Sequence, residues 1–113
     1  MVKEGYIPER GDIVWLDFDP QKGHEQKGNR PAIVISPKEY NEKVGLAIFC
    51  PITSQKKGYP FEVKIVSKKI TGVILSDQIK SFDWRKRDIK FITKSKDEEM
   101  AEVVGKINVL LNN

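Results

Sequence analysis

The stretch HEQKGNRPAIVIS, residues 24–36, joins a polar segment directly to an apolar run. The run from Ala32 to Ile35 is predicted to be a buried strand, because a short apolar run bounded by turn signals is typical of a sheet core. The polar segment before it carries Glu25 and Arg30, with a glycine between them. An acid and an arginine at the start of a core strand indicate a turn, a salt bridge or a catalytic pair.

Further short strands are predicted on both sides of residues 31–36. They are DIVWLDF (12–18), LAIFCPI (46–52), FEVKI (61–65), GVILSDQI (72–79) and DIKFI (88–92). In the first of them, Val14, Leu16 and Phe18 alternate with Ile13 and Trp15. Pro51 predicts a bulge or an edge near the end of its strand. Short strands with a turn signal every ~8–12 residues favour a small barrel or sandwich.

Two helices are expected among these strands. Ser36, Pro37 and Glu39 form a capping box for a helix of one or two turns, which Gly45 would end. A second capping box, SKDE at 95–98, precedes a longer C-terminal helix. The apolar residues of that helix fall on one stripe, which we expect to be buried against the sheet: Met100, Val103, Val104, Ile107, Leu110 and Leu111.

The composition fits one globular domain over residues 1–113. Apolar residues make up 39% and charged residues 32%, and no apolar run reaches the ~20 residues that span a bilayer. The N-terminus has no apolar signal core, so a cytoplasmic protein is expected. One cysteine, Cys50, and one histidine, His24, exclude an internal disulfide and a structural zinc site within one chain. Cys50 lies in an apolar run and is predicted to be a buried, unreactive thiol.

The formal net charge of +4 and pI of about 9.2 are weak evidence for an anionic partner. The distribution of charge is more informative, because basic residues gather in the expected loops: Lys22, Lys27, Arg30, Lys56, Lys57, Lys68, Lys69, Arg85, Lys86 and Arg87. Converging loops at one end of a barrel would form a positive rim for phosphates. An ordinary solvated surface accounts for the same pattern.

Glu25 and Arg30 allow two interpretations. A surface salt bridge, worth under ~1 kcal/mol, is favoured by the local pattern alone. In the functional interpretation, the Arg30 guanidinium binds phosphate oxygens in a bidentate manner and Glu25 accepts a hydroxyl proton. Attack of a 2′-hydroxyl on an RNA phosphodiester requires both.

Thr53 ends the strand 46–52 and is followed closely by Lys56 and Lys57. Its hydroxyl is either an ordinary cap at a strand end or a hydrogen-bond donor to a phosphate oxygen. The two lysines would then hold the flanking phosphates.

Four other groups of residues are candidates for a functional site. Asp17 and Asp19 face one way on a strand and could begin a metal site, although Asp-Pro is more often a turn, so we expect no metal. His24 is expected to be a loop residue or a substrate contact. Further along the chain, Asp77, Gln78 and Lys80 suit base edges. Trp84 beside Arg85 is either a base-stacking platform or a core tryptophan.

Taken in order along the chain, these segments resemble the MazF/PemK family of toxin endoribonucleases, also called mRNA interferases. The matching segments are RGDIVWLDFDPQKGHEQKGNRPAIVIS, PITSQKKGYPFEV, GVILSDQIKS and KINVLL, from Gly11 to Leu111. The first is the most specific, with its tryptophan-aspartate strand followed by the E-Q-x-G-x-R-P pattern.

The resemblance implies a mainly β fold with a C-terminal α-helix, a small SH3-like barrel (MazF/PemK/CcdB-like) that forms a homodimer. It implies a growth-arresting toxin that cleaves single-stranded RNA at short motifs without metal or cofactor, leaving 2′,3′-cyclic phosphate and 5′-hydroxyl ends. Arg30, Thr53 and Glu25 take the catalytic positions. The RNA-binding positions fall on Lys56, Lys57, Asp77, Gln78 and Lys80. The expected partner is an antitoxin with an acidic, extended tail, and the complex of the two is expected to bind DNA.

Three rival functions remain for experiment to separate. Small barrels also serve as non-catalytic nucleic-acid-binding modules. A gyrase-poison toxin family shares the barrel, although that function leaves Glu25, Arg30 and Thr53 without a role. A metal nuclease built on Asp17 and Asp19 would lose its activity in EDTA.

Overall fold

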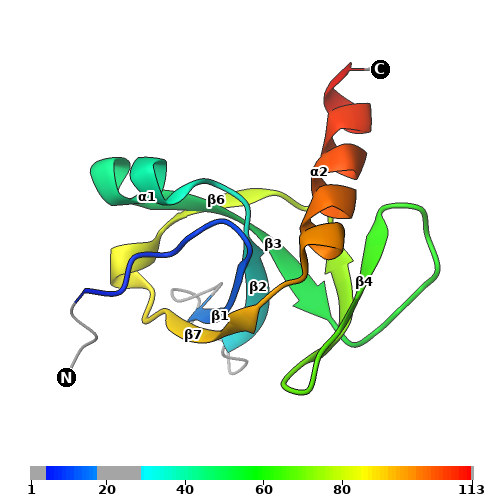
Figure 1. Ribbon diagram of the computed structural model, residues 1–113, viewed down its shortest axis with the longest axis horizontal. Helices are drawn as coiled ribbons and strands as arrows, with labels where there is room; N and C mark the ends of the chain where they lie inside the picture. The colour runs from blue at the N-terminus through cyan, green and yellow to red at the C-terminus, as the bar shows by residue number, and fades with distance from the viewer. Residues whose placement is uncertain (1–4, 18–28, 113) are drawn as a thin grey trace.

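The computed structural model describes residues 5–17 and 29–112, and its strands curve around a common interior (Figure 1). The helices are α1 (Lys38–Val44) and α2 (Asp97–Asn112), with a 3₁₀ turn at Trp84–Lys86. The strands are β1 (Asp12–Asp17), β2 (Asn29–Val34), β3 (Leu46–Thr53), β4 (Glu62–Val66), β5 (Thr71–Leu75), β6 (Lys80–Asp83) and β7 (Lys90–Lys94). The mainly β fold with a C-terminal helix is thereby confirmed.

Strand β3 is the centre of the antiparallel sheet, whose order is β4-β5-β3-β2-β1-β7. It pairs with β2 from Phe49 to Pro51, with β6 from Leu46 to Phe49, and with β5 at Ile52 and Thr53. Pro51 lies between the β6 and β5 pairings, where its missing N–H costs no ladder hydrogen bond. Pro51 therefore marks a change of partner strand. Of the predicted bulge or edge, the bulge does not form, because the register with β2 is unbroken, while the other edge of β3 is unpaired at Pro51.

The apolar residues Ala32–Val34 of β2 are buried on both faces of the sheet. Ala32 and Val34 belong to one core cluster, with Leu16, Phe49 and Trp84, whereas Ile33 packs into the other, with Ile13 and Cys50. Successive strand residues point to opposite faces, so a strand covered on both sides needs apolar residues throughout. In the neighbouring strand β1, Trp15 differs from the buried Val14 and Leu16 on either side of it, because 41% of its surface is exposed.

Two predicted strands differ most in extent from the observed ones, and one observed strand was not predicted. The stretch 72–79 forms a strand only as far as Leu75, because residues 76 and 77 form a turn. The strand predicted at 88–92 is β7, which begins at Lys90, and β6 was not predicted at all. Strand β6 has two exposed and two half-buried residues and takes its place by pairing with the buried strand β3, so its own residues carry little periodic signal.

Helix α1 ends as predicted but begins differently. Gly45 closes it in the left-handed conformation, with φ 82°. Ser36 is not its N-cap, which is Pro37 without a side-chain cap hydrogen bond. The Ser36 hydroxyl instead donates to Asn41 Oδ1 at 2.6 Å and accepts from the Ile48 N–H at 2.8 Å. The hydroxyl therefore ties α1 to β3 rather than capping α1.

The start of α2 is displaced by one residue from the predicted capping box. The Lys96 N–H donates to Glu99 Oε1 at 2.8 Å, so the carboxylate of Glu99, and not that of Glu98, closes the first turn. The Glu99 N–H in turn donates to the Lys96 carbonyl.

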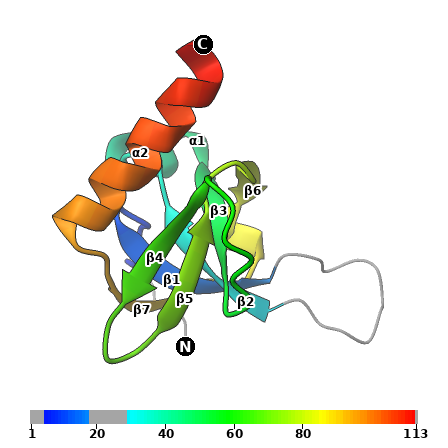
Figure 2. The same ribbon diagram turned by 90° about the vertical axis from the view of Figure 1, so that its right-hand side faces the viewer.

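Only part of the α2 stripe is buried. Figures 1 and 2 both show α2 beside β4, against which it packs. Val103 is fully buried, and Met100 and Ile107 pack against the same core cluster. The expectation of a fully buried stripe is wrong for the rest of it, because Val104, Leu110 and Leu111 are 37%, 45% and 73% exposed. Within residues 5–17 and 29–112, neither helix has the length and apolar character that a membrane crossing needs.

A buried asparagine makes a testable contribution to this fold. Asn41 is fully buried, and its Nδ2 donates to the carbonyls of Pro8 at 2.8 Å and Ser36 at 3.1 Å. Asn41→Ala strands these carbonyls and the Ser36 hydroxyl, so we expect it to lower the free energy of unfolding by about 3 kcal/mol in urea titrations. The exposed Asn108→Ala should change it by less than about 0.5 kcal/mol. Equal losses in the two variants would contradict the role given to Asn41.

Candidate active site

Arg30 is held at the start of β2 by the strand that follows it. It pairs with Leu16 of β1, and Pro31 pairs with Trp15. The three residues after Pro31 are fully buried, whereas Arg30 itself is exposed. Pro31 has no N–H to extend the ladder and fixes its own φ, so the backbone of Arg30 is anchored while its guanidinium reaches outward.

Thr53 is the last residue of β3 and pairs with Val73 of β5. Its Oγ1 accepts a hydrogen bond from the Gln55 N–H at 3.1 Å, which turns the chain away from the sheet. The accepted bond uses a lone pair of the hydroxyl, and among the described residues Thr53 donates its own proton to no acceptor. That proton can therefore be donated to a ligand.

The register of β2 and β3 brings Arg30 and Thr53 to the same place. Ala32 lies opposite Pro51 at the last pair of the ladder. Arg30 stands two residues before Ala32 and Thr53 two residues after Pro51, so the same register would set them opposite each other. Residues two apart on a strand point to one face, so both side chains project from the same side of the sheet.

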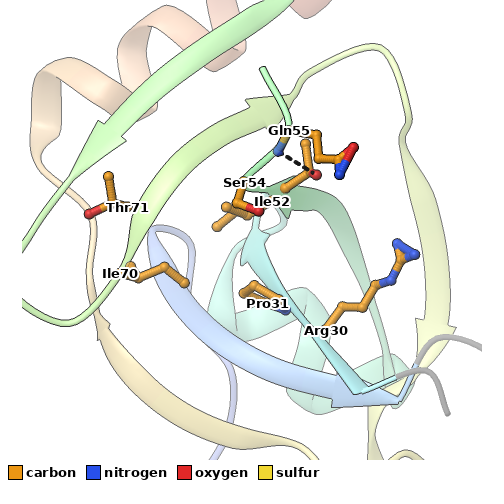
Figure 3. A pocket seen from close by; sticks show the side chains of 8 residues that line it. Arg30, Pro31, Ile52, Ser54, Gln55, Ile70 and Thr71 are labelled. Atoms are coloured by element: carbon orange, nitrogen blue, oxygen red, sulfur yellow. Dashed lines mark hydrogen bonds between the residues drawn. The ribbon is translucent and has the colours of Figure 1, made fainter. Parts of the chain in front are cut away.

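Both residues line one pocket of about 500 Å³, which Figure 3 shows from close by. Arg30 reaches into it from β2, toward the side where Gln55 lies. The remaining wall comes from the end of β3 and from the turn that leads into β5. The described lining residues are Arg30, Pro31, Ile52, Thr53, Ser54, Gln55, Ile70 and Thr71.

The chemistry of this wall suits a small anion. Among the described residues no carboxylate lines it, while a guanidinium, hydroxyls and a carboxamide do. Arg offers a fixed fork of donors that matches phosphate oxygens, and a neutral hydroxyl beside it adds a further donor.

A second, smaller cavity of about 160 Å³ adjoins the first and shares Thr53 and Gln55 with it. Its other described walls are Lys57, Tyr59, Glu62, Leu75 and Gln78. Of the predicted RNA-binding residues, Lys57 and Gln78 therefore lie beside the Arg30–Thr53 pocket.

Asp77 is placed by a tyrosine. The Tyr59 hydroxyl donates to Asp77 Oδ1 at 2.7 Å and lies 2.9 Å from Oδ2. This hydrogen bond is the main reason that the pKa of Tyr59 is raised above its ordinary value. Lys56 and Lys80 are exposed, and neither lines either cavity.

Other predicted site residues have different outcomes. Glu25, His24 and Asp19 lie outside the described residues, whereas Asp17 ends β1 and its carbonyl accepts from Arg87 at 2.9 Å. Within the described part of the chain, no three His, Cys, Asp or Glu side chains gather as a metal site would require.

The two apolar candidates both belong to the core. Trp84 is only 6% exposed and its Nε1 donates to the Asn41 carbonyl at 3.0 Å, while the Arg85 guanidinium covers its ring at 4.7 Å. The base-stacking hypothesis is therefore wrong for Trp84. Cys50 is buried, as predicted, and burial raises the pKa of its thiol to about 12.

Sequence reasoning missed Gln55, Ile70, Thr71 and Tyr59. A signal existed for Gln55, because a Thr hydroxyl commonly accepts a hydrogen bond from the backbone N–H two residues later and so forms a local turn. None existed for Ile70 and Thr71, which reach the pocket only because β5 pairs with the end of β3.

Comparison with known proteins adds a second kind of observation. The family model for PemK-like, MazF-like toxins of type II toxin–antitoxin systems matches residues 9–111. The chain is 48% identical to the endoribonuclease toxin MazF of Escherichia coli strain K12 over 106 residues, 94% of this chain and 96% of that protein. It is 32% identical to the endoribonuclease PemK of Escherichia coli over 108 residues, 91% of this chain and 81% of the other.

Solved structures match equally well. Crystalline MazF from Deinococcus radiodurans superposes with a TM-score of 0.85 at 47% identity, over 96% of this chain and 99% of that one. A MazE–MazF crystal structure from the same organism gives a TM-score of 0.88 at 48% identity, over 94% and 96% of the two chains.

A glycine tests how tightly Thr53 is held. A Cβ on Gly72 would lie 2.5 Å from the Thr53 carbonyl oxygen and 3.2 Å from its carbonyl carbon. Gly72→Ala must therefore displace the end of β3, and we expect a loss of about 1–3 kcal/mol of stability in urea unfolding. In α2, a Cβ on Gly105 meets nothing within 4 Å, so Gly105→Ala should stabilise by about 0.5–1 kcal/mol. A Gly72→Ala variant as stable as the parent would show that Thr53 is not tightly held.

Proposed function

Since the chain belongs to the family of PemK-like, MazF-like toxins of type II toxin–antitoxin systems, we propose that it is an endoribonuclease toxin that cleaves single-stranded RNA at short motifs. Messenger RNA is the main substrate that we propose. One observation carries the proposal: Arg30 and Thr53, distant in sequence, line one pocket without a described carboxylate.

The proposed reaction is a transesterification within the RNA. The 2′-oxygen attacks the adjacent phosphorus, the bond from phosphorus to the 5′-oxygen breaks, and the leaving oxygen takes up a proton. The products are a 2′,3′-cyclic phosphate and a 5′-hydroxyl, and no metal or water is consumed in this step. Negative charge accumulates on the non-bridging oxygens as the 2′-oxygen bonds, so donors aimed at those oxygens lower the barrier.

Arg30 and Thr53 are the proposed donors. The guanidinium binds non-bridging oxygens through its fork, and the Thr53 hydroxyl adds one more hydrogen bond. Arg30 acts electrostatically, because a guanidinium holds its protons too tightly to serve as a proton shuttle. Glu25, which lies outside the described residues, is the proposed base for the 2′ proton on the strength of the sequence resemblance.

The path of the RNA on either side of the cleaved bond is proposed along the second cavity. Lys57 and Gln78 line it, and Lys56, Asp77 and Lys80 extend the proposed contacts along the exposed surface. Lysines supply phosphate affinity without base selectivity, whereas a carboxamide offers a donor and an acceptor to a base edge.

The proposed assembly is a homodimer of SH3-like barrels in the cytoplasm. The exposed apolar residues at the end of α2 support an interface with another copy: Val104, Val109, Leu110 and Leu111. The proposed inhibitor is an antitoxin, which the MazE–MazF structures of the relatives support, and its acidic, extended tail is proposed from the sequence resemblance. The net charge of +4 favours such a partner.

The direct test is incubation of the purified protein with a long RNA in EDTA, followed by analysis of the ends. We expect cleavage at a short recurring motif, with 2′,3′-cyclic phosphate and 5′-hydroxyl ends. RNA that stays intact with and without EDTA would favour a binding module. Cleavage that occurs only without EDTA would favour a metal nuclease. Trapped DNA breaks in the presence of gyrase would favour the gyrase-poison function.

Arg30 should be the most sensitive residue in the cleavage assay. Arg30→Ala removes the donors that stabilise the transition state, so we expect the single-turnover rate to fall at least about a hundredfold with the fold retained. Arg30→Lys keeps the charge but not the fork and should be similarly impaired.

The matched control is Lys38→Ala, which removes a positive charge from α1 and touches neither cavity. It should cleave nearly as fast as the parent. If Arg30→Lys cleaved as fast as the parent, the bidentate role of Arg30 would be wrong.

A further inference from the structure

The lysine loop is the segment between β3 and β4, residues 54–61, and it carries Lys56 and Lys57. It is exposed along most of its length. An exposed loop of this length is expected to sample many conformations unless side chains tie it down. The described contacts show that side chains of several other elements tie it down.

The first tie is the carboxylate of Glu62, at the start of β4. Its Oε2 accepts from the Lys57 N–H at 2.9 Å, and its Oε1 accepts from the Gly58 N–H at 2.9 Å. Gly58 has φ +83°, a conformation that lets consecutive N–H groups converge on one anion. Both oxygens of Glu62 therefore face the backbone of the lysine loop.

Two further side chains hold the same loop from outside it. Lys106 of α2 donates to the Pro60 carbonyl at 2.5 Å and lies 3.4 Å from the Glu62 carbonyl oxygen. The Tyr59 hydroxyl donates to Asp77, beyond the end of β5. The lysine loop is thus fixed to α2, to β4 and to the turn after β5.

We propose that Glu62 is a positioning residue for RNA binding, which holds the lysine loop in the shape that presents Lys57 to the RNA. This inference rests on the proposed function. Glu62 lines the second cavity together with Lys57 and Gln78, yet a carboxylate there repels phosphate. Its contribution is therefore indirect: it orders the loop before RNA arrives, so that binding does not have to supply the ordering entropy.

A substitution that removes the charge of Glu62 distinguishes a positioning role of this residue from a purely electrostatic role. Glu62→Gln removes one negative charge beside the RNA path, which by itself should strengthen RNA binding. The amide, however, presents an NH₂ where an N–H needs an acceptor, so the lysine loop loses one of its two backbone bonds and gains a repulsive contact. Positioning and electrostatics therefore predict opposite changes in KM.

The experiment compares Glu62→Gln with the parent in two measurements. The first is KM and kcat for cleavage of a short RNA, and the second is hydrogen exchange of the Lys57 and Gly58 amides without RNA. We expect KM to rise roughly tenfold with kcat within about twofold, and both amides to lose protection. Glu42→Gln is the control, because it changes charge equally on α1 and touches neither cavity.

A second variant keeps the inference testable if Glu62→Gln fails to fold. Gly58→Ala leaves the charge unchanged but disfavours the left-handed φ that the N–H pair requires, and should raise KM in the same selective way. A lowered or unchanged KM in Glu62→Gln overturns the inference, as does full amide protection in that variant. Absence of cleavage by the parent would instead overturn the proposed function, and the exchange data would still report whether Glu62 orders the loop.

Discussion

Everything at the candidate site depends on the sharing of one strand among three partners. The first half of β3 pairs with β6, its middle with β2, and its last two residues with β5. The changeover falls at Pro51, which cannot donate to a ladder. The pairing with β2 also ends at Pro51, and the pocket that Arg30 and Thr53 line lies beyond this last pair.

The same constraint makes the site rigid where chemistry needs rigidity. Arg30 is fixed by a buried strand on its C-terminal side, and Thr53 by β5, whose Gly72 lets the two backbones come close. Donors held in place before substrate binds lose no energy to reorganisation during the reaction. The lysine loop extends this principle to binding, since Glu62 and Lys106 fix a segment that carries little apolar surface of its own.

Local pattern predicted the buried strands, the end of α1 at Gly45 and the burial of Cys50, because each depends on neighbouring residues. It missed what depends on distant partners. The half-exposed strand β6 forms through its pairing with β3, and Ser36 does not cap α1, because its hydroxyl bonds to Asn41 and to the Ile48 N–H instead. The sequence left Trp84 as either a stacking surface or a core residue, and its burial beside α1, which accepts its indole N–H, makes it a core residue. Likewise Arg30 and Thr53 could be named from resemblance, but their juxtaposition follows only from the register of β2 and β3.

The most direct measurement is a crystal structure of the protein with a short RNA that carries a 2′-deoxy sugar at the cleavage position and so cannot react. The account predicts one phosphate in the pocket, with the Arg30 guanidinium and the Thr53 hydroxyl each within about 3.2 Å of its non-bridging oxygens. A bound RNA whose reacting phosphate touches only one of the two side chains, or neither, would contradict it.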